Sequence, residues 1–230
     1  MEKHLTGFIT YIKDIVYGAT DGIITTFAIV AGSFGADLAP KVILILGFAN
    51  LLADGFSMAA SNFLGSKSEN DLYKKEEKRE YDEVKNLPDK EKEEVREIFI
   101  KFGFDNQQAQ NLVNLTSTNE NFWVDFMMRY ELKMNPLSAG SEWKSALATF
   151  ISFVLAGSLP LLPFVFLPVS DTNSLLYSVI ATGIALFTVG AARYFVTSVN
   201  WLISGLEMLL VGGIAASVSY LAGYLISAVV

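Results

Sequence analysis

Cysteine is absent from this 230-residue chain, and histidine occurs only once, as His4. Without cysteine there are no disulfide bonds and no thiolate metal ligands. We interpret His4 as an exposed residue near the N-terminus, because chain ends are rarely ordered. Since histidine is the most common general base in enzymes, the sequence argues against catalysis that needs a histidine base. Basic residues are also in deficit. The net charge of −7 argues against binding to nucleic acid, whose phosphates attract basic surfaces.

Charged residues are scarce outside one segment of the chain. They make up 18% of all residues, against about 25% in typical soluble domains. Sixteen of the 24 acidic residues and twelve of the 17 basic residues lie between Lys67 and Lys133. The rest of the chain is strongly apolar. We therefore expect two parts, a membrane body and a highly charged insert.

Five apolar stretches approach the roughly 20 residues that a helix needs to cross a bilayer. They predict an all-α integral membrane protein with five transmembrane helices and a helical insert between the second and third. We expect residues 1–65 to hold the first two spans, residues 66–137 the insert, and residues 138–230 the other three. The stretches are Ile15–Phe34, Val42–Leu64, Ala146–Val169, Leu175–Val199 and Trp201–Val230.

The distribution of basic residues predicts the orientation in the membrane. If the N-terminus and the insert face the cytoplasm, sixteen of the 17 basic residues lie inside and only Lys41 lies outside. The C-terminus then ends outside. Because no sorting signal is visible, we favour the cell (inner) membrane over a vacuolar-type membrane.

Helix signals divide the insert into about four helices. Asp89 and Asp105 are expected N-caps, and Gly103 is an expected residue after a helix C-terminus. Ser117 begins a capping-box spacing, and Pro136 is expected to end the last helix. The predicted helices are Ser66–Asn86, Lys90–Phe102, one from Asp105 to about Leu115, and Asn121–Lys133.

Glutamates in the insert recur at helical spacing. Glu80 and Glu83 are three residues apart, as are Glu91 and Glu94, and Glu76 lies one turn before Glu80. Like charges at this spacing destabilise a helix, whereas a divalent cation can bridge them, as in helical di-iron proteins. The alternative is a solvated charged helix, which pairs of opposite charge on the same helices favour.

Two methionines precede a further glutamate at helical spacing. Met127 and Met128 lie four and three residues before Glu131. A set of thioethers and carboxylates suits Fe²⁺, Mn²⁺ or Cu(I) better than Mg²⁺ or Ca²⁺. The alternative is that both methionines fill the core. Together with the glutamate pairs, this pattern favours a transition-metal site, at which we also consider Zn²⁺ and Co²⁺.

The apolar spans contain polar side chains, and a charge at bilayer depth costs about 2.5–3.5 kcal/mol. We therefore expect these side chains to line an ion or proton path. The alternative is a structural polar cluster, and for the last span an ion pair with Arg193 on the span before it. The candidate path residues are Asp21 in the first span, Asn50, Asp54 and Met58 in the second, and Glu207 in the fifth.

Six stretches of the sequence, taken together in their order along the chain, resemble the vacuolar iron transporter family, in particular its prokaryotic-type members. They are spread over nearly the whole chain, and none is decisive alone. They are Asp21–Ala28, Asn50–Glu69, Tyr73–Glu83, the Met127-Met128-x-x-Glu131 helix, Pro160–Pro163 and Ser204–Glu207.

The resemblance implies a homodimer of five-span protomers that exports Fe²⁺, often with Mn²⁺, from the cytosol in exchange for protons. It implies partners of membrane lipid, divalent metal ions and protons, and no tightly bound cofactor. The insert then corresponds to the family's cytoplasmic metal-binding domain, and Asp21 and Met58 match its membrane path. The implied insert ligands are Glu80, Glu83, Glu91, Glu94, Met127, Met128 and Glu131.

One position departs from the plant-type pattern, which has a glutamate where this chain has Asn50. A carboxylate follows one turn later at Asp54, and we infer that Asp54 takes over the proton or metal role. Iron or manganese preference and proton stoichiometry do not follow from the sequence.

Other functions fit parts of the pattern. The main alternative is a membrane-anchored metal buffer or sensor that does not transport. Another is a carrier for a different substrate, with the insert as a docking module. A ferroxidase-like enzyme is the least favoured, because the insert contains no histidine ligand.

Overall fold

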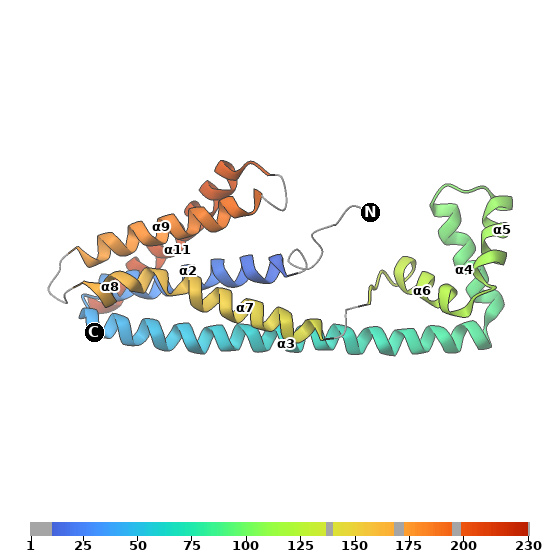
Figure 1. Cartoon of the computed structure of the whole chain (residues 1–230), viewed down its shortest axis with the longest axis horizontal. Helices are drawn as coiled ribbons and strands as arrows, with labels where there is room; N and C mark the ends of the chain where they lie inside the picture. The colour runs from blue at the N-terminus through green and yellow to red at the C-terminus, as the bar shows by residue number, and fades with distance from the viewer. Residues whose placement is uncertain (1–10, 137–139, 168–172, 195–198, 230) are drawn as a thin grey trace. The chain divides into compact units, whose positions relative to one another are not determined.

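A computed structural model describes residues 11–136, 140–167, 173–194 and 199–229 (Figure 1). These residues form helices and connecting turns, with no strand among them. The chain divides into two compact units, residues 1–63 with 142–230, and residues 64–141. His4, the predicted insert boundary at Leu137 and the predicted end of the third span at Val169 lie outside the described residues.

The first unit contains the helices that are long and apolar enough to cross a membrane. Five such helical stretches are found in the described residues, which confirms the predicted all-α fold with five spans. The third span consists of α7, a short 3₁₀ turn at Leu159–Leu161 and α8. The helices are α2 (Ile12–Gly35), the first part of α3 (Pro40–Asn86), α7 (Ser141–Gly157), α8 (Leu162–Phe166), α9 (Ser174–Ala192) and α11 (Trp201–Ser227).

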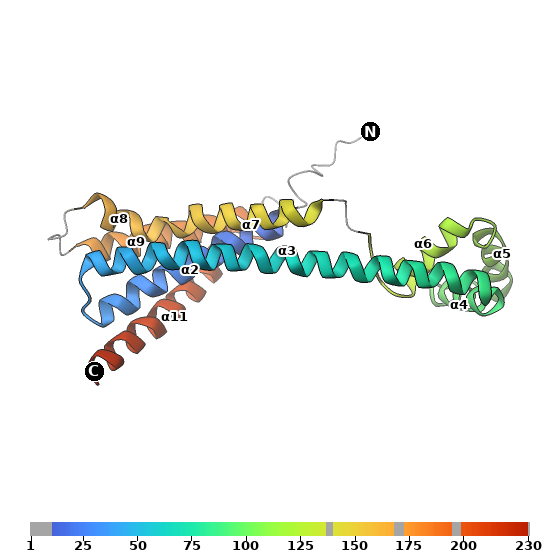
Figure 2. The same ribbon diagram turned by 90° about the horizontal axis from the view of Figure 1, so that it is seen from below.

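Glycines allow the membrane helices to approach closely around α2, which packs against α7, α9 and α11 (Figures 1 and 2). A Cβ atom on Gly22 would overlap the backbone carbonyl of Phe153 in α7. A Cβ atom on Gly223 of α11 would overlap the carbonyl of Gly32 in α2. Small residues at such contacts are typical of helix association in membranes, where van der Waals packing replaces the hydrophobic effect.

Two prolines, Pro160 and Pro163, lie where the third span is interrupted. Helix α7 ends at Gly157, and Pro160 lies in the 3₁₀ turn before α8. Proline lacks the N–H that would continue the helical ladder. The Ser178 hydroxyl of α9 donates to the Pro160 carbonyl (2.7 Å), so the break is tied to a neighbouring helix.

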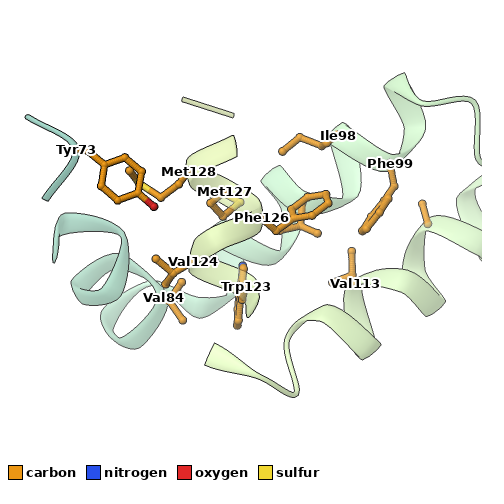
Figure 3. Packing of buried hydrophobic residues seen from close by; sticks show 12 residues of the cluster. Tyr73, Val84, Ile98, Phe99, Val113, Trp123, Val124, Phe126, Met127 and Met128 are labelled. Carbon is orange, nitrogen blue, oxygen red and sulfur yellow. The ribbon is translucent and has the colours of Figure 1, made fainter. Parts of the chain in front are cut away.

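The second unit is formed by the rest of α3 together with α4 (Pro88–Lys101), α5 (Asn106–Thr116) and α6 (Glu120–Tyr130). All four helices contribute side chains to one hydrophobic cluster (Figure 3). Among its buried members are Tyr73 of α3, Phe99 of α4, Val113 of α5 and Trp123 of α6. This core brings the charged faces of α3, α4 and α6 into one unit.

The helix boundaries in this unit confirm two predicted signals. Asp105 caps α5 in a capping box with Gln108, and Gly103 has a left-handed backbone (φ +97°) just after α4. The prediction of a helix that begins at Ser66 is wrong, because α3 runs without a break from Pro40.

Two other predicted caps are wrong. Helix α4 begins at Pro88, whose fixed φ suits the first helical position, so Asp89 lies inside the first turn. Helix α6 is capped by Asn119, whose side chain accepts the Phe122 N–H (3.1 Å), and not by Ser117. It ends at Tyr130, before the predicted Lys133.

Candidate metal centre and membrane carboxylates

Five glutamates of the second unit come together from three helices. The side-chain oxygens of Glu80, Glu83 and Glu91 lie within 4.8 Å of one another, and so do those of Glu91, Glu94 and Glu131. Because Glu91 belongs to both groups, the five form one continuous cluster, which we call the glutamate cluster. Glu80 and Glu83 come from α3, Glu91 and Glu94 from α4, and Glu131 directly follows α6.

The centre of the glutamate cluster is buried. Glu91 is 0% exposed and Glu80 is 4% exposed. Both carboxylate oxygens of Glu91 and one of Glu80 have no hydrogen-bond partner among the described residues. Buried carboxylates without partners are costly, and in proteins they are usually paired or bound to a metal. The arrangement is therefore suited to a divalent cation.

The pKa values of the two buried glutamates are raised. Burial, together with repulsion from Glu131 and then Glu91, raises the pKa of Glu80 to about 7. Burial and repulsion from Glu94 raise the pKa of Glu91 to about 7, although Lys90 opposes this. A cation between these carboxylates would replace the bound protons.

Two basic side chains partly balance the glutamate cluster from its edge. Lys90 Nζ lies 2.9 Å from Glu94 and 3.6 Å from Glu91. Arg79 Nε donates to Glu83 (3.0 Å). Both basic side chains are largely exposed, so they leave the buried end of the cluster with excess negative charge.

Three of the predicted insert ligands, Glu76, Met127 and Met128, lie outside the glutamate cluster. Glu76 belongs to neither group of oxygens found in the described residues, and its carboxylate lies 3.8 Å from Arg79. Met127 and Met128 are both 0% exposed and belong to the hydrophobic cluster (Figure 3). This is the environment of a core-filling methionine. The Glu131 N–H donates to the Met127 carbonyl (2.9 Å), so the helical turn that holds both methionines ends at a member of the glutamate cluster.

Polar contacts hold the start of α6 against α3. The Tyr81 hydroxyl donates to Asn121 Oδ1 (2.9 Å), and Lys85 Nζ lies 3.2 Å from Glu120. Together with the hydrophobic cluster, these contacts fix the helix that presents Glu131 to the α3 and α4 glutamates.

In the first unit, the structure brings two predicted path residues together. Asp21 of α2 and Asp54 of α3 lie close enough for their charges to interact. Asn50, Asp54 and Met58 are spaced four residues apart on α3 and are all half-buried. Gly22, next to Asp21, is one of the residues at which α2 contacts the α7 backbone. The two aspartates are thus held at a closely packed part of the unit.

Asn50 lines an open groove of about 590 Å³ between α2, α3 and α11. Ser33 of α2 and Ser219 of α11 line the same groove. Of the three α3 residues Asn50, Asp54 and Met58, Asn50 therefore borders space that other molecules can occupy.

Glu207 is an exposed residue of α11 with a basic partner. Its carboxylate lies 3.6 Å from Arg193 Nη1. This is the ion pair that the sequence suggested as an alternative to a path role. The neighbouring Met208 accepts a long hydrogen bond from the Thr20 hydroxyl (3.9 Å).

The structure also shows a polar network that sequence reasoning missed. The Asn62 side-chain amide donates to Asp14 (2.9 Å) and to the Thr149 hydroxyl (2.8 Å), which joins α2, α3 and α7. Asn62 and Asp14 were each visible as polar residues near the ends of apolar stretches. Nothing in the sequence links them, because the partners lie 48 and 87 residues from Asn62.

Comparisons with known proteins agree over nearly the whole chain. A family profile described as the VIT family matches residues 12–224. The vacuolar iron transporter of Centaurea cyanus is 36% identical over 219 residues, covering 95% of this chain and 89% of that protein. Vacuolar iron transporter 1 of Arabidopsis thaliana is 35% identical over 219 residues, covering 95% and 87%. The vacuolar iron transporter of Plasmodium berghei (strain Anka) is 35% identical over 224 residues, covering 94% and 82%.

Proposed function

The chain belongs to the VIT family, and on this premise we propose that it is a divalent metal transporter that moves Fe²⁺, and also Mn²⁺, out of the cytosol in exchange for protons. Members of this family are transporters and not enzymes. The observation that carries the proposal is the combination of a buried glutamate cluster in one unit with two membrane aspartates whose charges interact in the other.

The first proposed step is capture of the ion by the glutamate cluster from the cytosol. Its five carboxylates offer oxygen ligands at distances that one or two divalent ions can span. The buried oxygens of Glu91 accept no hydrogen bond from the described residues, which supports ligation there. We propose that Met127 and Met128 add sulfur ligands, which would favour Fe²⁺ over Mg²⁺ or Ca²⁺.

The second proposed step is passage along Asp21, Asp54 and Met58. A carboxylate can hold either a metal ion or a proton, so protonation from the far side releases the ion and couples the two fluxes. Asp54 supplies the second carboxylate of this path where Asn50 stands in place of the plant-type glutamate. Glu207, near Arg193, would lie at the cytosolic entrance.

We propose that the path is completed by a second copy of the chain. Asp21, Asp54 and Met58 are only half-buried within one protomer. A carboxylate that faces hydrocarbon costs about 2.5–3.5 kcal/mol. A homodimer that covers these side chains would remove that cost and would form the path at its interface.

The orientation follows from the positive-inside rule, which puts the glutamate cluster in the cytosol. The relatives are named as vacuolar transporters, while the absence of a visible sorting signal led us to propose the cell membrane. Fluorescence microscopy of a tagged full-length chain in its native cell separates these two locations.

The test of transport uses the full chain in proteoliposomes loaded with a metal-sensitive dye. We expect saturable Fe²⁺ and Mn²⁺ flux that protein-free liposomes lack. A protein that binds Mn²⁺ but produces no flux would be a metal buffer or sensor, and the transport proposal would be wrong.

A further inference from the structure

A cavity of about 600 Å³ lies at the surface of the second unit beside the glutamate cluster, and most of its lining residues are exposed. Glu94 and Glu131 of the cluster line it, as do the aromatic residues Phe102 and Tyr130. Ile98, a member of the hydrophobic cluster (Figure 3), lines it as well. The cavity is therefore built between α4 and α6, with part of the candidate metal centre in its wall.

The cavity is too large for a metal ion alone. A liquid water occupies about 30 Å³, so an ion with six waters would need on the order of 200 Å³. Cavities of about 300–1,000 Å³ are the size of small-molecule sites. The space suits an ion that arrives with an organic ligand.

The cavity is lined by equal numbers of acidic and basic residues. The acidic residues are Glu94, Glu97 and Glu131, and the basic residues are Lys101, Arg129 and Lys133. A divalent ion bound by the glutamates would make the lining net positive, so an anion is attracted only once the metal is present. A free polyanion would meet the three carboxylates as well as the three cations.

The three basic residues differ in whether an acidic side chain of the protein already pairs with them. Arg129 Nε binds both oxygens of Asp125 (2.9 Å each), and Lys101 lies 3.9 Å from Glu97. Lys133 makes no ion pair with any residue that the structure describes. Its ammonium is therefore the cation with most capacity for a ligand.

The backbone of Lys133 is also unusual. Its φ of +57° lies in the left-handed region, where a lysine is less stable than glycine by roughly 1–2 kcal/mol. The chain is held there by the Leu132 and Met134 N–H groups, which donate to the carbonyls of Met127 (3.2 Å) and Met128 (2.8 Å). A glycine would suit this turn better, so the lysine side chain has a reason to be there other than folding.

We propose that this cavity receives the metal as a complex with a small polycarboxylate. The ligand's free carboxylates bind Lys133 and Lys101, with Arg129 at the same wall, while Glu94 and Glu131 take the ion from it. This inference deepens the proposed capture step and rests on it. No bond is made or broken except the exchange of metal ligands.

The test measures retention of ¹⁴C-citrate by the full chain in detergent, by equilibrium dialysis at a fixed free Mn²⁺ concentration. Mn²⁺ binding is measured separately by the loss of its aqueous EPR signal. We expect about one citrate per chain with Mn²⁺ and at least tenfold less without it. By thermodynamic linkage, citrate must also tighten Mn²⁺ binding by the same factor.

The decisive variant is Lys133→Gly, because glycine keeps the left-handed turn and removes only the side chain. We expect thermal stability equal to or higher than that of the wild type, unchanged binding of aqueous Mn²⁺ and at least tenfold weaker citrate retention. Lys75→Ala, an exposed lysine of α3 that does not line the cavity, is the matched control and should retain citrate.

The outcomes separate this inference from the proposed function. If the chain binds Mn²⁺ but retains no citrate, or if Lys133→Gly retains as much as the wild type, the polycarboxylate site is wrong while metal capture stands. If the chain binds no Mn²⁺, the capture step fails and this inference fails with it.

Discussion

At the scale of single residues, Glu91 links the two groups of carboxylates in the second unit. It is the member shared by both groups of carboxylates, and it is fully buried, with oxygens that accept no hydrogen bond from the described residues. Its i,i+3 spacing to Glu94 was visible in the sequence. Its burial was not, because burial depends on α3 and α6 covering that face of α4.

Replacing Glu91 with glutamine removes a charge and a ligand while keeping the shape. We expect at least tenfold weaker Mn²⁺ binding by EPR, because the remaining oxygens no longer form two linked groups. We also expect higher thermal stability at pH 8 without metal, because a repelling buried charge is lost. Glu69→Gln, an exposed position outside the cluster, is the control. Unchanged Mn²⁺ affinity in Glu91→Gln would contradict the assigned metal centre.

The raised pKa values of Glu80 and Glu91 predict how the stability of this unit depends on pH. Both values are about 7 in the folded protein, against about 4.5 for an ordinary glutamate. Between about pH 4.5 and pH 7 the folded state binds more protons than the unfolded state, so the free energy of unfolding falls as pH rises. The added stability is present below about pH 4.5 and is lost as pH rises through 7.

Amide hydrogen exchange of the full chain in detergent measures this effect locally. After correction for intrinsic exchange rates, core amides such as those of Val95 and Val113 should be better protected at pH 5.5 than at pH 8. Saturating Mn²⁺ should restore protection at pH 8. Greater protection at pH 8 than at pH 5.5 in the metal-free protein would show that the carboxylates of the glutamate cluster do not destabilise the unit by repelling one another.

At the scale of elements, hydrophobicity and helix signals predicted much of the fold. Five apolar runs correspond to the five candidate spans, and Asp105 and Gly103 mark ends of α5 and α4 as expected. The errors arise where two signals compete. Proline at the first helical position displaced Asp89 as the start of α4, and Asn119 capped α6 in place of Ser117.

The candidate site was less predictable, because its geometry depends on contacts between distant elements. Helical spacing put Glu76 in the same stripe as Glu80 and Glu83, yet Glu76 falls outside the cluster and is near Arg79. The cavity beside Glu131 had no sequence signal, since its basic residues come from α4, α6 and the turn after α6. The Asp14–Asn62–Thr149 network is a further example.

Helix packing in the membrane unit gives a prediction at this scale. Gly223→Ala places a methyl group on the Gly32 carbonyl, so α2 and α11 must separate. Overpacking of this kind costs about 1–3 kcal/mol, and we expect a lower melting temperature in detergent. Gly213 on the same helix has open space around its position. Gly213→Ala should therefore melt at or slightly above the wild-type temperature, and equal effects of the two variants would contradict the packing.

At the scale of the whole molecule, two kinds of carboxylate site occur in one chain. The glutamate cluster supplies oxygen ligands in a unit rich in charge, and Asp21 and Asp54 supply carboxylates among apolar helices. Ion binding alone requires only the first. Carboxylates among membrane spans are costly unless they serve a path or face a partner, which is why we infer transport coupled to protons.

The most direct measurement of this claim is Mn²⁺ uptake into proteoliposomes under an imposed pH gradient, with wild-type chain and Asp21→Ala side by side. We expect wild-type uptake to increase when the interior is acidic, with protons leaving as Mn²⁺ enters. Asp21→Ala should bind Mn²⁺ normally but lose this uptake. Flux that does not respond to the gradient, or that is unchanged in Asp21→Ala, would contradict proton-coupled transport through this path.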